Sequence, residues 1–523
     1  MVVSGVFTGL SGLSVRRRWA AAVVVCLGLF LIGMDLTVLN VAVPGLRDAL
    51  DASMRQTQWV VDAYALVLGG LVLSVGAVTD RIGRRRAFVG GLMGCALASV
   101  VGGLAATPGQ VIVSRAGMGA GAALLMPATL SLVSGFFPQR RSRGRAIALW
   151  AAVGGLGGAL GPVIGGWLVT RFSWRAAFWV NLPFAATAAV LALWLVPAVR
   201  PVRDGRVDLP GAALSGTGLL ALVWAIIESP SRGWASPGVL AAFAVAALLL
   251  VTFAGWEHRG RAPMLPLPLL RRPRISMAAG ALALMSFGLF GALFLTTLYL
   301  QGVLGYTPWQ AGVRTLPLPA ALIAGAIVAA WSSARWGEKA TLLAGLCIVA
   351  AGFVVLALTR TGSGYGHLAV FQGVAGFGAG LVAPAATACV MDAMPAARAG
   401  LGSAINDATR QVGAALGVAV QGSVLAAAYT GHMHVVLRQA RAPEALAPAA
   451  DNILAAAAAA ARLPAADGRR LLASAEDAFV TGMTRAAVVA ALVSLCAAAA
   501  SWYWLPGSVT GESADDGPGV SPP

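Results

Sequence analysis

The stretch "GAVTDRIGRRRAFVGG", Gly76 to Gly91, decides how the chain is read, because it places a dense group of charges between two long apolar runs. It contains Asp80, Arg81 and three further arginines, although only 11% of all residues are charged. A short loop of this kind joins two membrane-spanning helices, and its arginines indicate that it faces the cytoplasm. Part of the charge therefore sets orientation, and Asp80 is the part that orientation does not explain.

The composition of the whole chain is that of a membrane protein with many spans. Of its 523 residues 58% are hydrophobic, and the mean hydropathy is +0.80, whereas soluble proteins are about 45–50% apolar. Apolar runs of 18 residues or more recur, and each is long enough to cross a bilayer as a helix. We therefore predict an all-α integral membrane protein. The net charge of +17 lies mainly in short loops, which favours a topological role and excludes nucleic acid as a partner.

Fourteen spans and their orientation follow from the pattern of apolar runs and arginines. The predicted spans cover about 19–43, 58–78, 87–105, 110–135, 146–169, 176–196, 209–228, 238–256, 275–300, 312–334, 340–358, 367–390, 402–428 and 481–504. The even-numbered loops carry most of the arginines, which places both termini in the cytoplasm. Residues 1–18 form the predicted cytoplasmic N-terminus, and 505–523 form a cytoplasmic tail expected to be disordered. A long extracellular loop is expected at about 429–480, with its stretch "DNILAAAAAAARL" helical and exposed to solvent.

An internal repeat predicts the architecture. "GAVTDRIGRRRAFVGG" aligns with "AWSSARWGEKATLLAG", Ala330 to Gly345, so that Gly83 falls on Gly337. In the same order, "GMGAGAALLMPAT" from Gly117 resembles "GFGAGLVAPAAT" from Gly376. We therefore predict two six-helix bundles, at about 19–196 and 275–504, with two inserted helices within 197–274. Parallel repeats of this kind are typical of transporters that rock one half against the other.

Three charged residues lie inside the apolar runs of the first bundle. Asp35 is predicted about eight residues from the outer end of the first span, and Asp62 and Arg115 at a similar depth in the second and fourth spans. Charged residues in such places are costly and usually face a cavity or a partner. We expect the two carboxylates and the guanidinium to share a cavity in which protonation is coupled to the arrival of a substrate. The alternative is a structural ion pair with an aspartate at a helix end.

The fifth span, "AAVGGLGGALGPVIGGWL", is rich in glycine. Small residues at this spacing let another helix approach closely, and proline permits a bend. The stretch predicts a bent helix at a moving interface, or close helix packing alone. The residues concerned are Gly154, Gly158, Gly161, Pro162, Gly165 and Gly166.

A second polar group opens the thirteenth span, "SAINDATRQVGAALG". Asp407 and Arg410 are three residues apart and share a helix face, which favours a local ion pair at the mouth of the helix. With Asn406 they form a possible secondary polar site. The sequence contains no nucleophile with a plausible base, no cluster of metal ligands and no nucleotide-binding loop. These absences argue against an enzyme, a metal site or a cofactor.

Four of these segments together resemble the major facilitator superfamily, in particular its fourteen-span drug:proton antiporter branch, over nearly the whole chain. "GAVTDRIGRRR" is similar to the loop motif after span two, and "MDLTVLNVAVP" to the first-span motif with its intramembrane aspartate. "RAGMGAG" resembles the span-four motif, and "GALGPVIGG" the antiporter motif of span five. Their order and spacing carry the resemblance.

The resemblance implies export of a small hydrophobic or cationic drug or antibiotic, driven by proton entry. The exporter would be a monomer in the cytoplasmic membrane of a bacterium. Arg115 would take part in proton coupling, with Asp35 and Asp62 as the acidic positions tied to protons or to cationic substrates. The loop motif would be a conformational latch between the halves, formed by Asp80, Arg81, Gly83 and Arg84. A facilitator or importer of a small metabolite and a non-transporting membrane sensor remain as alternatives.

Overall fold

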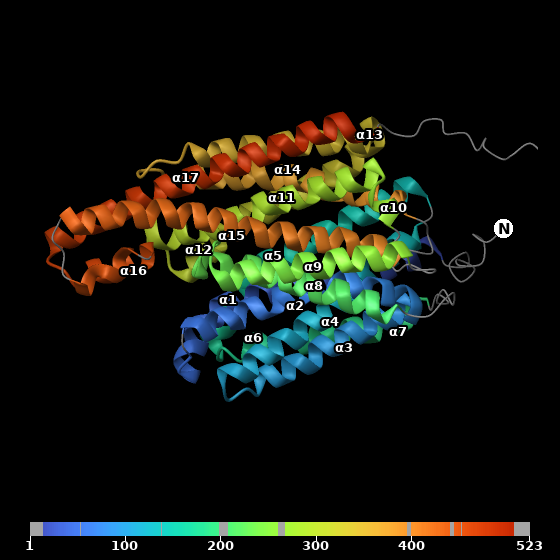
Figure 1. Cartoon of the computed structure of the whole chain (residues 1–523). Coiled ribbons are helices and arrows are strands. Elements are labelled where there is room, and N and C mark those ends of the chain that lie inside the picture. The colour runs from blue at the N-terminus through green and yellow to red at the C-terminus, as the bar shows by residue number, and fades with distance from the viewer. Residues whose placement is uncertain are drawn as a thin grey trace, which may run out of the picture.

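The chain folds into a long bundle of helices (Figure 1). The computed structural model describes residues 14–52, 54–137, 139–197, 208–259, 267–394, 399–439, 444–450 and 452–506. The first half contains α1 (Val15–Leu50), α2 (Met54–Ile82), α3 (Arg84–Gly103), α4 (Pro108–Phe136), α5 (Arg140–Arg171), α6 (Ala176–Trp179) and α7 (Asn181–Leu195). The inserted segment contains α8 (Leu209–Arg232), α9 (Pro237–Arg259) and α10 (Leu267–Leu270). The second half contains α11 (Pro273–Leu298), a π-helical turn (Tyr299–Val303), α12 (Pro308–Arg314), α13 (Pro317–Ala357), α14 (Tyr365–Asp392), α15 (Ala399–Gln439), a 3-10 turn (Glu444–Ala450), α16 (Ile453–Ala460) and α17 (Ala465–Trp504).

The predicted fold class is confirmed, with one helix that contains two of the predicted spans. Within the described residues, thirteen helices are long and apolar enough to cross a membrane. One of these spans, Trp309–Ala357, has 49 residues and covers the predicted tenth and eleventh spans. Gly337 interrupts its helix α13 with φ 86°, which is outside the helical region. The chain therefore turns at Gly337, and the thirteen candidate helices of the described residues are compatible with fourteen crossings, because the part of α13 on each side of Gly337 can cross once.

The internal repeat is visible at this turn. Gly83, between α2 and α3, has φ 94°, and its predicted counterpart Gly337 has φ 86°. A positive φ is costly for a residue with a β-carbon, so only glycine fits both turns without strain. The two halves therefore use the same backbone device at the same place in the repeat.

The second aligned pair of the repeat needs a correction of two residues. A β-carbon built on Gly91 would lie 2.8 Å from the carbonyl oxygen of Gly121, and one built on Gly345 would lie 2.8 Å from that of Gly378. The structural counterpart of Gly121 is thus Gly378, whereas the sequence comparison pairs it with Gly380. In a helix rich in small residues, several registers give similar sequence matches, and only the contact with the neighbouring helix decides between them.

The inserted helices cover the seam between the halves. Helix α8 packs against α2 of the first half and α15 of the second. Ser74 of α2 and Ser215 of α8 share a hydrogen bond of 2.9 Å between their hydroxyls. At the other end of α8, Trp234 donates a hydrogen bond of 2.9 Å to Ser423 of α15. The inserted pair therefore contacts both halves and stands outside their two cores.

The segment 429–480, expected to be a long loop, is mostly helical. Helix α15 continues to Gln439 and α17 begins at Ala465, so both extend well past their apolar portions, and α16 lies between them (Figure 1). The alanine-rich stretch is helical as expected, but Ile453 and Ala456 are buried and a β-carbon on Gly302 would meet Ile453 at 2.5 Å. Alanine and arginine favour helix, and three of the charges that indicated a loop here lie on helices: Arg438 on α15, and Arg469 and Arg470 on α17.

The two ends of the bundle differ in how the halves meet. We call the end where α1 begins and α17 ends the inner end, and the opposite end, which carries α16, the outer end (Figure 1). At the inner end, a β-carbon built on Gly76 of α2 would lie 2.1 Å from the β-carbon of Ala404 of α15. Met391 and Ala399 of the second half belong to the buried apolar cluster of the first half. The seam between α2 and α15 is therefore closed at the inner end.

Candidate functional site

Asp35 and Arg115 form a buried ion pair within the first half. Asp35 projects from α1 and Arg115 from α4, and they are 4% and 2% exposed. Arg115 Nη1 donates to Asp35 Oδ2 over 2.8 Å. Because α1 extends to Leu50, past the predicted end of the span at about 43, Asp35 lies fifteen residues, about 22 Å, from the outer end of its helix. The structure thus brings Asp35 and Arg115 together as an ion pair, which both the shared cavity and the structural pair would contain, so the coupling role stays a prediction.

Asn181, at the start of α7, donates the second hydrogen bond that the Asp35 carboxylate accepts. Its Nδ2 donates to Asp35 Oδ1 over 3.0 Å and to Ser99 Oγ of α3 over 3.0 Å. We call Asp35, Arg115, Asn181 and Ser99 the Asp35 cluster. Its members come from four helices, and each oxygen of the carboxylate receives one donor. A buried charge held in this way is paired and hydrogen-bonded, which is the condition for tolerating it in an apolar interior.

Arg115 also reaches the second helix. Its Nε donates to the carbonyl oxygen of Val60 over 3.3 Å, and its guanidinium lies 4.4 Å from the ring centroid of Tyr64. A cation over an aromatic face in a desolvated place is worth up to about 2 kcal/mol. If Asp35 lost its negative charge, Arg115 would keep its contacts with the Val60 carbonyl and the Tyr64 ring of α2, and it would have only neutral partners.

Asp62 lies on another face of α2. Val60 and Tyr64 are four residues apart and face Arg115, so Asp62, two residues from each, points to the opposite side of the helix. It is half-buried and seven residues before Gly69, on which a β-carbon would lie 3.5 Å from the β-carbon of Gln411 in α15. The structure therefore brings Asp35 and Arg115 together, and it places Asp62 toward the second half, on the outer side of the closed seam.

The sequence analysis missed Asn181 and Ser99. Asn181 lies in the otherwise apolar stretch "WVNLPFAAT", and a buried amide in a membrane helix usually has a polar partner. That signal was available. It could not identify the partner, because the contact joins α7 to α1 and α3, and no local spacing relates those helices.

The glycines of α5 divide into two sets by what they touch. A β-carbon on Gly161 would lie 2.8 Å from the carbonyl oxygen of Met34 of α1, and one on Gly165 would lie 2.7 Å from that of Val38. The hydroxyl of Thr37 donates to the carbonyl of Gly158 over 2.9 Å. Close contact with α1 is thus the first role of this helix, with Gly154 beside Leu29 of α1 at the inner side.

The other set faces the second half. A β-carbon on Gly166 would lie 2.8 Å from the Trp309 ring of α12, and the β-carbon of Pro162 lies 3.2 Å from the corresponding position on Gly312. Helix α5 therefore contacts α1 on one side and the opposite half on the other. Close packing therefore describes this helix, and the expected bend and movement at the interface stay predictions.

Only part of the predicted latch lies within the described side chains. Gly83 forms the turn before α3, and Arg84 is buried, with its Nη1 3.5 Å from the carbonyl oxygen of Ser131 in α4. The side chains of Asp80 and Arg81 lie outside the described residues, so the latch stays a prediction. The burial of Arg84 shows that this arginine also packs within the first half.

The predicted ion pair between Asp407 and Arg410 is wrong. Both side chains belong to the described part of the chain, and no nitrogen of Arg410 lies within 4.0 Å of a carboxylate oxygen of Asp407. The guanidinium of Arg410 instead lies 5.9 Å from the ring centroid of Trp150 in α5. Asn406 accepts a hydrogen bond of 3.0 Å from Thr387 of α14. The spacing puts the two charges on one face of α15, but the guanidinium of Arg410 lies toward Trp150 of α5 and not toward Asp407.

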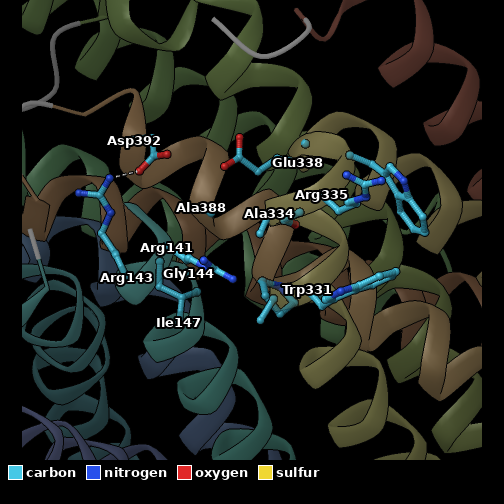
Figure 2. Close-up of a pocket in the computed structure, with 16 residues that line it drawn as sticks. Arg141, Arg143, Gly144, Ile147, Trp331, Ala334, Arg335, Glu338, Ala388 and Asp392 are labelled. Carbon is cyan, nitrogen blue, oxygen red and sulfur yellow. Dashed lines mark hydrogen bonds and ion pairs between the residues drawn. The ribbon is translucent and has the colours of Figure 1, made fainter. Parts of the chain in front are cut away.

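A cavity of about 680 Å³ opens at the inner end between α5 and helices α13 and α14 (Figure 2). Arg143 of α5 and Asp392 of α14 line it and form an ion pair of 2.5 Å. Arg141 and Ile147 line the first-half side, and Arg335 lies on the second-half side. The ion pair joins the two halves beside the cavity.

Comparison with known proteins agrees with this geometry. The family described as Major Facilitator Superfamily matches residues 25–418. The methylenomycin A resistance protein of Streptomyces coelicolor is 36% identical over 76% of this chain and 84% of its own length. The multidrug efflux pump LfrA of Mycolicibacterium smegmatis is 34% identical over 92% of this chain and 95% of its own. The solved structure of the proton:xylose symporter XylE shares the fold, with a TM-score of 0.61 and 15% identity over 94% of this chain and 96% of its own.

Proposed function

Because the chain belongs to the Major Facilitator Superfamily, we propose that it is a proton-coupled antiporter that exports a small hydrophobic or cationic drug or antibiotic across the cytoplasmic membrane. The names of its relatives support this substrate class, since they include a methylenomycin A resistance protein and a multidrug efflux pump. The proton gradient drives the cycle, with no cofactor and no enzymatic step. The protein acts as a monomer with both termini in the cytoplasm.

The observation that carries the proposal is the buried carboxylate of Asp35. One of its oxygens accepts from Arg115 and the other from Asn181. A proton that reached Asp35 would cancel its attraction to Arg115 and exchange one acceptor for a donor, so the cluster has two different hydrogen-bonded arrangements. A group with this property can couple the entry of a proton to a change of helix packing.

The path from Asp35 to the interface runs through α1. Asp35 faces α4 and α7, and Thr37, two residues further along, bonds to Gly158 of α5 on the other side of α1. Helix α5 contacts α12 of the second half at Gly166. A small displacement of α1 after protonation is thereby transmitted to the surface on which the halves move. Interfaces packed as closely as these change between discrete arrangements.

Export against a proton gradient can be measured directly. Cells with and without the gene are compared for growth on an antibiotic panel, and the compounds whose inhibition is relieved are then tested in everted membrane vesicles. We expect uptake into vesicles that have been acidified by respiration, and loss of uptake when an ionophore collapses the pH gradient. An importer would instead raise sensitivity in cells, and a sensor would change neither measurement.

The ion pair between Arg143 and Asp392 is expected to hold the inner end closed. Its side chains are 26% and 14% exposed, and partly exposed pairs contribute up to about 1 kcal/mol. Replacing Arg143→Gln should therefore raise the population open at the inner end roughly two- to fivefold. The measurement is the rate at which Ile147→Cys, fully buried in this structure, reacts with a maleimide in everted vesicles of a cysteine-free background.

The matched control exchanges the two charges. In Arg143→Asp with Asp392→Arg the attraction is restored across the same gap, so the labelling rate should return toward that of the parent. If the exchanged protein labels as fast as the single variant, the pair does not hold the halves together.

A further inference from the structure

Helix α15 contains a second buried aspartate, Asp407, which is fully buried. It lies eight residues after Ala399, the first residue of α15, which is about 12 Å from the inner end of the helix. Asp35 belongs to the other half and lies deep in α1. The two buried aspartates are therefore in different halves, and Asp407 is the one that lies near the inner end.

The carboxylate of Asp407 is only half satisfied. Its Oδ1 accepts a weak hydrogen bond of 3.5 Å from Asn406, and its Oδ2 is buried without any hydrogen-bond partner. One turn earlier, the buried hydroxyl of Ser403 lies beside this carboxylate without the geometry of a hydrogen bond, and Nε of Arg410 is also buried without a hydrogen bond. Three polar groups close together on one helix thus have atoms that could form further hydrogen bonds.

An ionised carboxylate in this position is costly. A buried charge needs a counter-ion and hydrogen bonds to both oxygens, and breaking either condition costs several kcal/mol. The guanidinium of Arg410 is turned toward Trp150 and forms no ion pair with Asp407. A proton on Oδ2 removes the charge and supplies an O–H that Ser403 can accept. The observed geometry therefore suits the neutral acid, and movement of Arg410 toward Asp407 would suit the anion.

The surroundings of Asp407 connect it to both halves. Asn406 receives the hydroxyl hydrogen of Thr387 in α14. Trp150, the residue that holds Arg410, belongs to α5 and donates to Thr129 of α4 over 2.9 Å. Arg410 is the charged group that acts on Asp407, while α14 presents a hydroxyl and α5 an indole, which do not titrate near neutral pH. A change of charge on Asp407 would therefore change the position of Arg410 and its contact with α5 in the other half.

We infer that Asp407 is a second proton-binding site, located in the second half, which holds a proton in the state closed at the inner end and gives it up as Arg410 turns from Trp150 to pair with it. This inference rests on the proposed antiport. It implies that two protons, one on Asp35 and one on Asp407, enter for each molecule exported. For a substrate with one positive charge, such an exchange moves net charge inward, so the membrane potential contributes to the driving force.

The proton can be observed without transport. Purified protein in lipid nanodiscs is measured by infrared spectroscopy at neutral pH, where a buried protonated carboxyl group gives a separate C=O band. We expect the Asp407→Asn variant to lose this band, Asp407→Glu to shift it and Asp35→Asn to retain it. An Asp407→Asn spectrum identical to that of the parent would overturn the inference, whatever the transport activity.

Transport provides the second arm, with the monovalent cation ethidium as the probe in proteoliposomes. We expect the parent to move ethidium under a membrane potential alone, and Asp407→Asn to lose that response while it keeps the response to a pH gradient. If the infrared band depends on Asp407 but the parent moves no compound against either gradient, the proposed antiport fails and the proton site stands. If the potential-driven part survives in Asp407→Asn, the second proton is not coupled and the inference fails.

Discussion

Replacing Asp35→Asn is expected to reduce pH-gradient-driven export to the background of cells without the gene. The amide keeps the shape of the carboxylate and can still accept from Arg115, but it cannot take up a proton or carry a charge. The cluster then has one state in place of two, so the cycle loses the event that couples it to the gradient. The measurement is the initial rate of uptake into everted vesicles, with the amount of protein in the membrane determined in parallel.

A change at Asp35 also alters stability, and a second variant separates the two effects. Asp35→Asn leaves the buried Arg115 without a counter-ion, and breaking a buried pair in this way costs up to about 3–5 kcal/mol. The double variant Asp35→Asn with Arg115→Gln has no buried charge at this point. We expect it to recover the melting temperature in detergent but not the transport. Recovery of transport along with stability would show that the pair is only structural.

Asp62→Asn is the matched comparison within the same half. Asp62 faces the second half, on the outer side of the closed seam, so its charge can meet a substrate in a way that the buried Asp35 cannot. We expect Asp62→Asn to raise the concentration of a cationic compound needed for half-maximal uptake, with little effect on a neutral compound. Loss of uptake for both kinds of compound alike would instead place Asp62 with Asp35 in proton coupling.

Much of the fold was predictable because it depends on periodic features of the chain. Apolar length determines where a helix can cross a membrane, and the repeated turn at Gly83 and Gly337 depends on a backbone conformation that glycine alone adopts easily. The segment 429–480 was harder. Its charges exclude it from the apolar core of a membrane, but they do not oppose helix formation, so α15 and α17 continue where the hydropathy falls.

Part of the candidate site was predictable, because the energetic cost of an unpaired charge in a membrane leaves few possible partners for each charged residue. A charge inside a membrane needs a partner, and the first half has few candidates, so Asp35 and Arg115 could be paired from the sequence. Asn181 could not be assigned, because an amide can bond to many groups. For Asp407 and Arg410, the spacing gave a face of the helix but not the direction of the long arginine side chain, which lies toward Trp150 on α5.

Replacing Gly161→Ala in α5 is expected to cause a large loss of both stability and export. The added β-carbon would lie 2.0 Å from Oγ1 of Thr37, 2.8 Å from the carbonyl oxygen of Met34 and 3.0 Å from the backbone nitrogen of Val38. Thr37 can turn aside, but the other two atoms are backbone, so α1 and α5 must separate. Overpacking of this kind typically costs about 1–3 kcal/mol, and here it also displaces the helix that carries Asp35.

Gly158→Ala is the control that makes this prediction specific. The two glycines are three residues apart on one helix, yet a β-carbon on Gly158 would meet nothing nearer than the Gly33 carbonyl oxygen, at 3.8 Å. Its own carbonyl, which accepts from Thr37, is unchanged by the substitution. Alanine favours helix over glycine by up to about 1 kcal/mol, so Gly158→Ala should melt at the parent temperature or slightly above and should export normally. If both variants fail alike, glycine is needed here for the flexibility of α5; if only Gly161→Ala fails, the close contact with α1 is what the antiporter helix provides.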